Sequence, residues 1–187
     1  MIDVVYDACV LYSAALRDLL MNLAMARLVR PHWSNEIHEE WIGSLLRNRP
    51  ELSRESLERT RRRMDAKAKN ALTKGYEFLL PTLTLPDSKD CHVFAVAIYT
   101  RSLWIVTFNL TDFPKTTLQP YGIEAISPDE FVQRLIRDNP GRVRQAIKDH
   151  RLDLKHPPKT ADEYLATLEK QRLPKTVAFL REHKGEI

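Results

Sequence analysis

Residues 103–108, LWIVTF, form a nearly continuous apolar run in which polar and apolar side chains do not alternate. A strand with one face in water alternates, whereas a parallel strand covered by helices on both faces does not. The run therefore predicts a strand inside a parallel sheet that is covered on both sides.

The rest of the chain alternates between short β-favouring runs and segments with helical periodicity. Further strands are predicted at residues 1–7, 28–31 and 122–127. Apolar spacing and capping residues predict helices at residues 14–28, 34–49, 53–75, 87–102 and 127–137, with Gly75 ending the third in a left-handed conformation. We therefore expect a three-layer α/β/α sandwich with a mainly parallel central sheet.

The pattern changes after residue 138. Helical periodicity continues in residues 143–154 and 163–168, but prolines interrupt it and no strand pattern follows. We predict one domain over residues 1–138 and a C-terminal helical extension over residues 139–187.

The composition excludes some classes of protein. No apolar run approaches the roughly 20 residues that a membrane helix needs. The N-terminal segment MIDVVYDACV lacks the basic region and cleavage site of a signal peptide, so we expect a cytoplasmic protein without membrane contact. Cys9 and Cys91 are expected to be free thiols, because a cytoplasmic pair rarely forms a disulfide.

Positive charge is concentrated in one part of the chain. The net charge is +4, and basic residues gather between residues 47 and 74. Such a segment favours contact with phosphates, although a solvated helix face is the simpler alternative for any single arginine. The candidate nucleic-acid contacts are Arg61, Arg62, Arg63 and Lys67.

Oxygen side chains follow two of the predicted strands. Asp7 and Asn109 come directly after strands, and Asp112 follows three residues later. The starts of two predicted helices add Glu36, Glu39, Glu40, Asp87 and Asp90. In an open α/β sheet the functional crevice lies beyond the carboxyl ends of the strands, where these groups would meet. Carboxylates that meet repel one another unless a cation neutralises them, and Mg²⁺ or Mn²⁺ suits oxygen ligands. Taken singly, each of these residues could instead be a helix cap, a turn residue or a solvated side chain.

Four segments together resemble the PIN-domain nucleases, particularly the VapC-like toxin branch of type II toxin–antitoxin systems. They are VVYDACVLYSAALRDLL, WSNEIHEEW, LPDSKDCHVFAVAI and IVTFNLTDF, and the resemblance covers roughly residues 1–136. It implies a PIN-like fold and a set of catalytic acids made up of Asp7, Glu40, Asp90 and Asp112. Glu36 remains the alternative second acid, and Asp87 is a near neighbour of the third.

The resemblance also implies supporting roles and one departure from the family pattern. Asn109 stands where many relatives have aspartate, so it is expected to be an auxiliary metal ligand that adds no charge. The hydroxyl of Thr107 is expected to orient a carboxylate or water. His92 is expected to be a helix-surface residue or a partner of a carboxylate rather than a general base.

The resembled family hydrolyses RNA phosphodiester bonds with one or two Mg²⁺ or Mn²⁺ ions. The implied function is therefore a metal-dependent endoribonuclease that is the toxin partner of a small DNA-binding antitoxin. By analogy with the family, a homodimer is also expected. Two alternatives stay open at this point. One is a PIN nuclease of RNA processing or decay without an antitoxin, and the other is a catalytically weak module that binds RNA or protein.

Overall fold

A four-stranded parallel sheet lies at the centre of the protein. A computed structural model describes residues 1–155 and 157–187. The strands are β1 (Ile2–Tyr6), β2 (Val29–His32), β3 (Trp104–Val106) and β4 (Glu124–Ile126), arranged in the order β2-β1-β3-β4 with every neighbouring pair parallel. The apolar run at residues 103–108 thus supplies a central strand, as its composition predicted.

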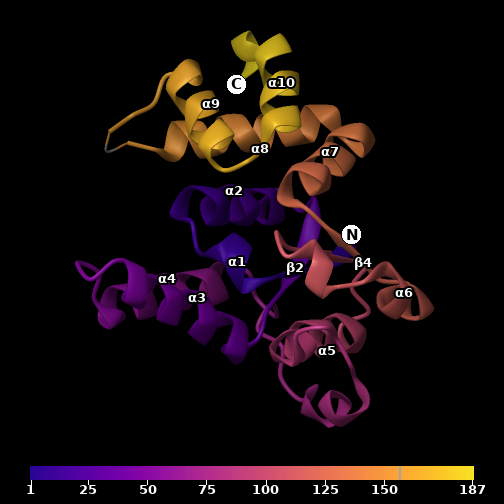
Figure 1. Ribbon diagram of the computed structural model, residues 1–187. Helices are drawn as coiled ribbons and strands as arrows, with labels where there is room; N and C mark the ends of the chain where they lie inside the picture. Colours follow the sequence, from indigo (N-terminus) through magenta and orange to yellow (C-terminus); the bar gives the residue numbers. More distant parts are fainter. Residues whose placement is uncertain (156) are drawn as a thin grey trace.

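Helices cover both faces of this sheet (Figure 1). The α-helices are α1 (Ala8–Leu11), α2 (Ala14–Met25), α3 (Asn35–Asn48), α4 (Arg54–Lys67), α5 (Cys91–Tyr99), α6 (Lys115–Leu118), α7 (Pro128–Asp138), α8 (Pro140–Asp153), α9 (Ala161–Lys170) and α10 (Pro174–Glu182). Short 3-10 turns are η1 (Glu77–Thr82), η2 (Ser88–Asp90), η3 (Leu110–Asp112), η4 (Gln119–Tyr121) and η5 (Lys184–Glu186). In Figure 1, α2 and α8 lie on one side of the strands and α5 lies on the other. The predicted three-layer α/β/α sandwich is confirmed.

Local sequence explains where several helices begin. The hydroxyl of Ser34 accepts a hydrogen bond from the backbone N–H of Ile37 at the start of α3. Ser127 does the same for Glu130 at the start of α7. Each of these side chains satisfies a backbone donor that the first helical turn leaves free, so the helix starts where the cap is placed.

The C-terminal helices share the hydrophobic core with the sheet layers. Helix α8 packs on α2, and α10 packs on α7 and α9. The carboxylate of Asp129 in α7 accepts hydrogen bonds from the backbone N–H groups of Lys175 (3.0 Å) and Thr176 (2.9 Å), which caps the start of α10. The side chains of Val143 and Val177 are fully buried in the same cluster as those of the strands. The division of the chain at residue 138 stays a prediction.

Helix α4 ends earlier than its sequence predicts. It stops at Lys67 rather than at Gly75, so the predicted helix end was wrong. After α4 the chain returns to the sheet, where the N–H of Trp33 donates to the carbonyl of Ala71 (3.0 Å) and the N–H of Thr73 donates to the carbonyl of Trp33 (2.8 Å). Gly75 does adopt a positive φ of 82°, but in the loop beyond this bridge.

Three helices end in a left-handed arginine, one of which is Arg172 after α9 with a φ of 62°. Arg27 after α2 and Arg101 after α5 have φ values of 55° and 54°. The N–H of Leu28 then bonds the carbonyl of Leu23, and the N–H of Ser102 bonds the carbonyl of Ala97. This is the Schellman hydrogen-bond pattern, in which the left-handed position is usually glycine.

Two further expectations concern cysteine and the membrane. Cys9 is half-buried and Cys91 is buried, and both are free thiols, as predicted. Among the described residues, no helix combines the length and the apolar character that crossing a membrane requires.

Candidate active site

Asp7 is the buried centre of the site. It follows β1 directly, and only 3% of its surface is exposed. Its Oδ2 accepts hydrogen bonds from Thr107 Oγ1 (2.6 Å) and Cys9 Sγ (3.1 Å), and its Oδ1 accepts one from the N–H of Ala8 (2.6 Å). Thr107 follows β3, the neighbour of β1, so parallel pairing brings the two side chains together. Burial raises the pKa of Asp7, although these hydrogen bonds act in the opposite direction.

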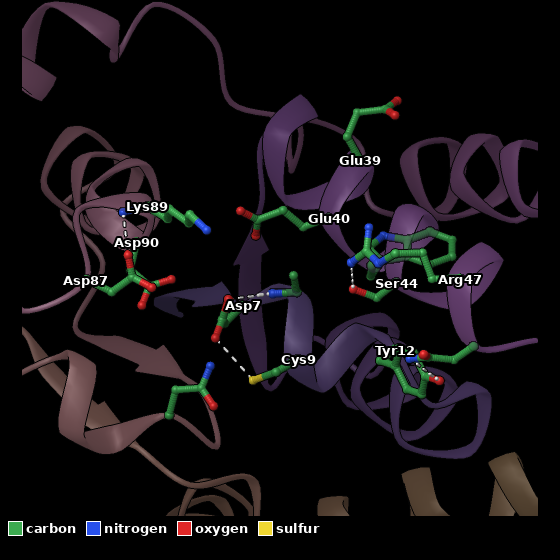
Figure 2. A pocket seen from close by; sticks show the side chains of 14 residues that line it. Asp7, Cys9, Tyr12, Glu39, Glu40, Ser44, Arg47, Asp87, Lys89 and Asp90 are labelled. Atoms are coloured by element: carbon green, nitrogen blue, oxygen red, sulfur yellow. Dashed lines mark hydrogen bonds between the residues drawn. The ribbon is translucent and has the colours of Figure 1, made fainter.

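A pocket of about 720 Å³ opens in front of Asp7. Figure 2 shows that the carboxylates of Asp7, Glu40, Asp87 and Asp90 point toward a common space. They come from three separated segments: the end of β1, the middle of α3, and the η2 turn that leads into α5. Asn109 also lines this pocket, and we call the pocket with these five side chains the acidic pocket.

The acids affect one another electrostatically. Burial, followed by repulsion from Asp7, Asp112, Asp87 and Glu40, raises the pKa of Asp90 to about 6. Asp112 does not line the acidic pocket, yet its charge reaches Asp90 from the η3 turn. This mutual repulsion indicates that the acidic side chains of the pocket outweigh its basic ones.

The two candidate second acids have different surroundings. Glu40 lines the acidic pocket, and its Oε1 lies 2.9 Å from Nε2 of His92. Burial lowers the pKa of His92, but the hydrogen bond and the charge of Glu40 outweigh it and raise that pKa overall. Glu36 instead accepts a hydrogen bond from the hydroxyl of Tyr76 and does not line the pocket. His92 is therefore a partner of a carboxylate, which is one of the two roles expected for it from the sequence.

Buried hydrogen bonds fix helix α3, which carries Glu40. Oδ1 of Asp65 in α4 accepts a hydrogen bond from Trp33 Nε1 (2.8 Å) and lies 3.1 Å from His38 Nε2. Trp41 Nε1 donates to His38 Nδ1 (3.0 Å). An indole N–H can only donate, so Nδ1 of His38 is an acceptor and Nε2 carries the proton toward Asp65. Trp33 and Trp41 are buried core residues in this arrangement.

The four predicted nucleic-acid contacts lie in different surroundings. Arg61 binds Asn35 (2.7 Å) and Glu39 (3.3 Å) on α3, so its guanidinium is engaged within the protein. Arg62 is exposed and lines none of the hollows described here, whereas Arg63 and Lys67 line a hollow between α2, α4 and α8. None of the four lines the acidic pocket.

Other residues of the acidic pocket were missed in the sequence. Cys9, Tyr12, Arg47 and Lys89 line it and were not assigned to it. Cys9 and Lys89 each lie within two residues of a predicted acid, which was a usable signal. Tyr12 and Arg47 reach the pocket only through the packing of α1 against α3, which a single sequence does not reveal.

The donor chemistry of the acidic pocket fits a divalent cation. Carboxylate and amide oxygens are ligands that Mg²⁺ and Mn²⁺ accept, and the excess negative charge around Asp90 favours a cation. In the described part of the chain, however, no three His, Cys, Asp or Glu side chains form a group that could already hold an ion. Mg²⁺ usually keeps several water ligands and binds through one or two carboxylates, so the acids of the pocket suit a hydrated ion.

Comparisons with known proteins agree with this geometry. The PIN domain profile matches residues 3–111, and the profile described as "VapC50 C-terminal domain" matches residues 128–182. A protein of Mycobacterium tuberculosis named "Putative ribonuclease VapC50" is 41% identical over 68 residues, which span 35% of this chain and 40% of that protein. No solved structure matches this chain significantly. With more than half of its residues matched and its acids gathered at the carboxyl ends of a parallel sheet, the chain belongs to the PIN-domain family.

Proposed function

We propose that this protein is a Mg²⁺- or Mn²⁺-dependent endoribonuclease and the toxin of a type II toxin–antitoxin pair. The observation that carries the proposal is the acidic pocket, where burial and then repulsion from neighbouring carboxylates raise the pKa of Asp90 to about 6. The name of the Mycobacterium tuberculosis relative supports ribonuclease activity. The proposal includes a nuclease domain at residues 1–138, a helical extension at residues 139–187, and a cytoplasmic location.

In this proposal Asp7, Glu40, Asp90 and Asp112 hold one or two divalent cations, and Asn109 is an auxiliary ligand. Asp87 and Glu36 have supporting positions near these acids. A cation bound there would supply a Lewis acid that acidifies water and offsets the negative charge of the reacting phosphate. The choice of Glu40 as second acid is supported by its place in the acidic pocket, which Glu36 does not line.

The chain's own residues orient these groups. Thr107 and the N–H of Ala8 hold the Asp7 carboxylate at 2.6 Å each, which fixes its orientation at the pocket that it lines. His92 holds Glu40 at 2.9 Å. Lys89 and Arg47 line the same pocket and provide positive charge for phosphate oxygens of the substrate.

Metal-dependent cleavage of RNA tests the enzymatic part. We expect the chelator-treated protein to cleave labelled single-stranded or structured RNA only after Mg²⁺ or Mn²⁺ is added, and Asp7→Asn and Asp90→Asn to abolish cleavage. Asp162→Asn is the matched control, because Asp162 is exposed on α9 and pairs with Lys184 far from the acidic pocket. Equal cleavage by all four proteins would contradict the assignment.

Expression in cells tests the toxin part. We expect expression of the protein alone to arrest growth, Asp7→Asn to remove the arrest, and co-expression of a small DNA-binding protein encoded beside it to restore growth. RNA cleavage without growth arrest would point to an RNA-processing nuclease instead. A gel-filtration profile would show whether the protein forms the proposed homodimer.

A further inference from the structure

A groove leads from the acidic pocket toward the C-terminal helices. The acidic pocket shares Tyr12 with a second hollow of about 520 Å³, and this hollow shares Arg17 and Thr60 with a third of about 340 Å³. The second hollow lies between α2 and the α3–α4 pair, and the third is closed at its far side by α8. We call the two hollows the side groove, which runs from Tyr12 past Arg17 and Thr60 to Arg63, Lys67 and His150.

Arg17 is a buried cation at the junction of the two hollows. Only 7% of its surface is exposed, and its guanidinium lies 5.0 Å from the centroid of the Trp41 ring. Its Nη1 donates to the carbonyl of Leu11 (2.8 Å), whereas its Nε has no partner. Within residues 1–155 and 157–187, no carboxylate forms an ion pair with it. The charge of Asp18 attracts this guanidinium but forms no ion pair with it. A buried charge without a paired counter-ion is costly, so this position favours an anion in the side groove.

Further positive charge lines the same groove. Arg63 and Lys67 lie one helical turn apart on α4, are exposed, and form no ion pair among the described residues. The acids of the side groove are Asp18 and Asp153. The basic residues of the groove are Arg17, Arg49, Arg63 and Lys67, and of these Arg49 pairs with Glu51. The charge therefore changes from negative in the acidic pocket to positive along the groove.

The walls of the side groove also offer apolar surface. Ala14, Ala15 and Leu52 line the hollow of about 520 Å³ and are exposed or half-buried, and the ring of Tyr12 stands where the groove meets the acidic pocket. Unpaired bases can lie on apolar and aromatic side chains, whereas the bases of a duplex are hidden in the stack. A groove that combines cations with such walls suits a single nucleic-acid strand.

We propose that the side groove binds the single strand of RNA that extends from the acidic pocket, with Arg17, Arg63 and Lys67 contacting its phosphates. This rests on the proposed function, because it takes RNA as the substrate of the acidic pocket. It adds a direction for the strand, past Tyr12 toward α8, and a phosphate-binding role for Arg17.

Binding measured without cleavage tests the proposal. In an Asp7→Asn background, fluorescence anisotropy is recorded for a trinucleotide and for a strand of about 12 nucleotides, a length within the range of known single-strand grooves. We expect Arg63→Met with Lys67→Met to weaken binding of the longer strand roughly tenfold, and to reduce its salt slope by about 1.4, or about 0.7 for each lost phosphate contact. Binding of the trinucleotide should not change, because it fills only the acidic pocket.

Arg137→Met with Lys170→Met is the matched control, since it also removes two exposed positive charges but neither residue lines the acidic pocket or the side groove. Arg17→Met should give a loss of the same kind, and if this buried change prevents folding, the exposed double variant of the groove carries the test. If the Arg63→Met, Lys67→Met protein has the same affinity and salt slope as the Arg137→Met, Lys170→Met control, the proposal is overturned and the groove is left to another occupant, such as a polypeptide. Binding is measured in the inactive Asp7→Asn protein, so it does not depend on cleavage. A failure of the nuclease proposal would appear in the separate cleavage assay, as cleavage that does not depend on Asp7.

Discussion

Thr107 Oγ1 donates a 2.6 Å hydrogen bond to Oδ2 of Asp7, joining two residues that are 100 positions apart in the sequence. Each residue follows one of two neighbouring parallel strands, so the bond forms at the carboxyl edge of the sheet. The hydroxyl also accepts a hydrogen bond from the N–H of Asn109 (3.0 Å), which ties the Asp7 carboxylate to the loop that carries Asn109.

Replacing Thr107 with valine should therefore weaken both stability and activity. The change keeps the shape but removes a hydrogen bond to a buried carboxylate, which costs roughly 1.5–3 kcal/mol. We expect urea unfolding to show a loss of that size and RNA cleavage to fall with it. Thr107→Ser retains the hydroxyl and is the control. If the valine and serine variants unfold at the same urea concentration, the bond does not contribute to stability.

Asp90→Asn should stabilise the ion-free protein at neutral pH. The pKa of Asp90 is raised from 3.8 to about 6 in the folded protein, so the folded state binds the proton more tightly than the unfolded chain does. Stability therefore falls as the pH rises from about 3.8 to about 6, and the asparagine variant lacks this loss.

Urea unfolding of both proteins in a chelator, at several pH values between 4 and 7, checks this prediction. The quantity to compare is the difference in the free energy of unfolding between the variant and the wild type. Burial lowers the pKa values of His38 and His150, so in both proteins stability also falls as the pH drops below 6.5, and the difference removes this shared effect. Parallel pH curves for the two proteins would contradict the raised pKa.

Asp129→Ala should release the C-terminal helix α10. The Asp129 carboxylate caps this helix through the N–H groups of Lys175 and Thr176 and also accepts from the Thr176 hydroxyl (2.8 Å). Loss of a helix cap typically costs about 1 kcal/mol, with an upper end near 2 kcal/mol. We expect faster amide hydrogen exchange in residues 174–182. Asp129→Asn keeps one oxygen acceptor and should lie between the alanine variant and the wild type.

Asp65→Ala should loosen the position of α3, and with it Glu40, and so lower activity without removing any side chain of the acidic pocket. The change leaves Trp33 Nε1 and His38 Nε2 without their buried partner, and each unsatisfied donor costs roughly 1–3 kcal/mol. Thermal unfolding and the KM for RNA are the measurements. Asp65→Asn retains an oxygen acceptor for the Trp33 N–H and is the milder control. An alanine variant with wild-type stability would show that water replaces the carboxylate.

Local sequence was sufficient for features that depend on nearby residues. The burial of residues 104–107 on both faces could be read from the apolar composition of this run, although Leu103 before them is exposed. Ser34 and Ser127 mark helix starts through hydrogen bonds to residues three positions away. The local sequence also predicted that Asp7 and Asn109 follow strands. Because the carboxyl ends of parallel strands share one edge of the sheet, the two residues could be placed at the same edge.

Features that depend on distant residues could not be predicted. The end of α4 is set by backbone bonds between Trp33 and residues 71 and 73, which the helical pattern of residues 53–75 does not contain. His92 meets Glu40 across 52 residues. Arg17 lies in an apolar helix, and nothing in its neighbourhood in the sequence distinguishes a buried cation from a surface one.

The left-handed arginines after α2 and α5 are positions where a substitution could increase the stability of the fold. A side chain in this conformation costs roughly 1–2 kcal/mol relative to the right-handed region, and glycine avoids that cost. Arg27 and Arg101 lie outside the acidic pocket and the side groove. Glycine at either position is thus a change that could compensate a destabilised active-site variant, so that loss of activity can be measured in a protein that still folds.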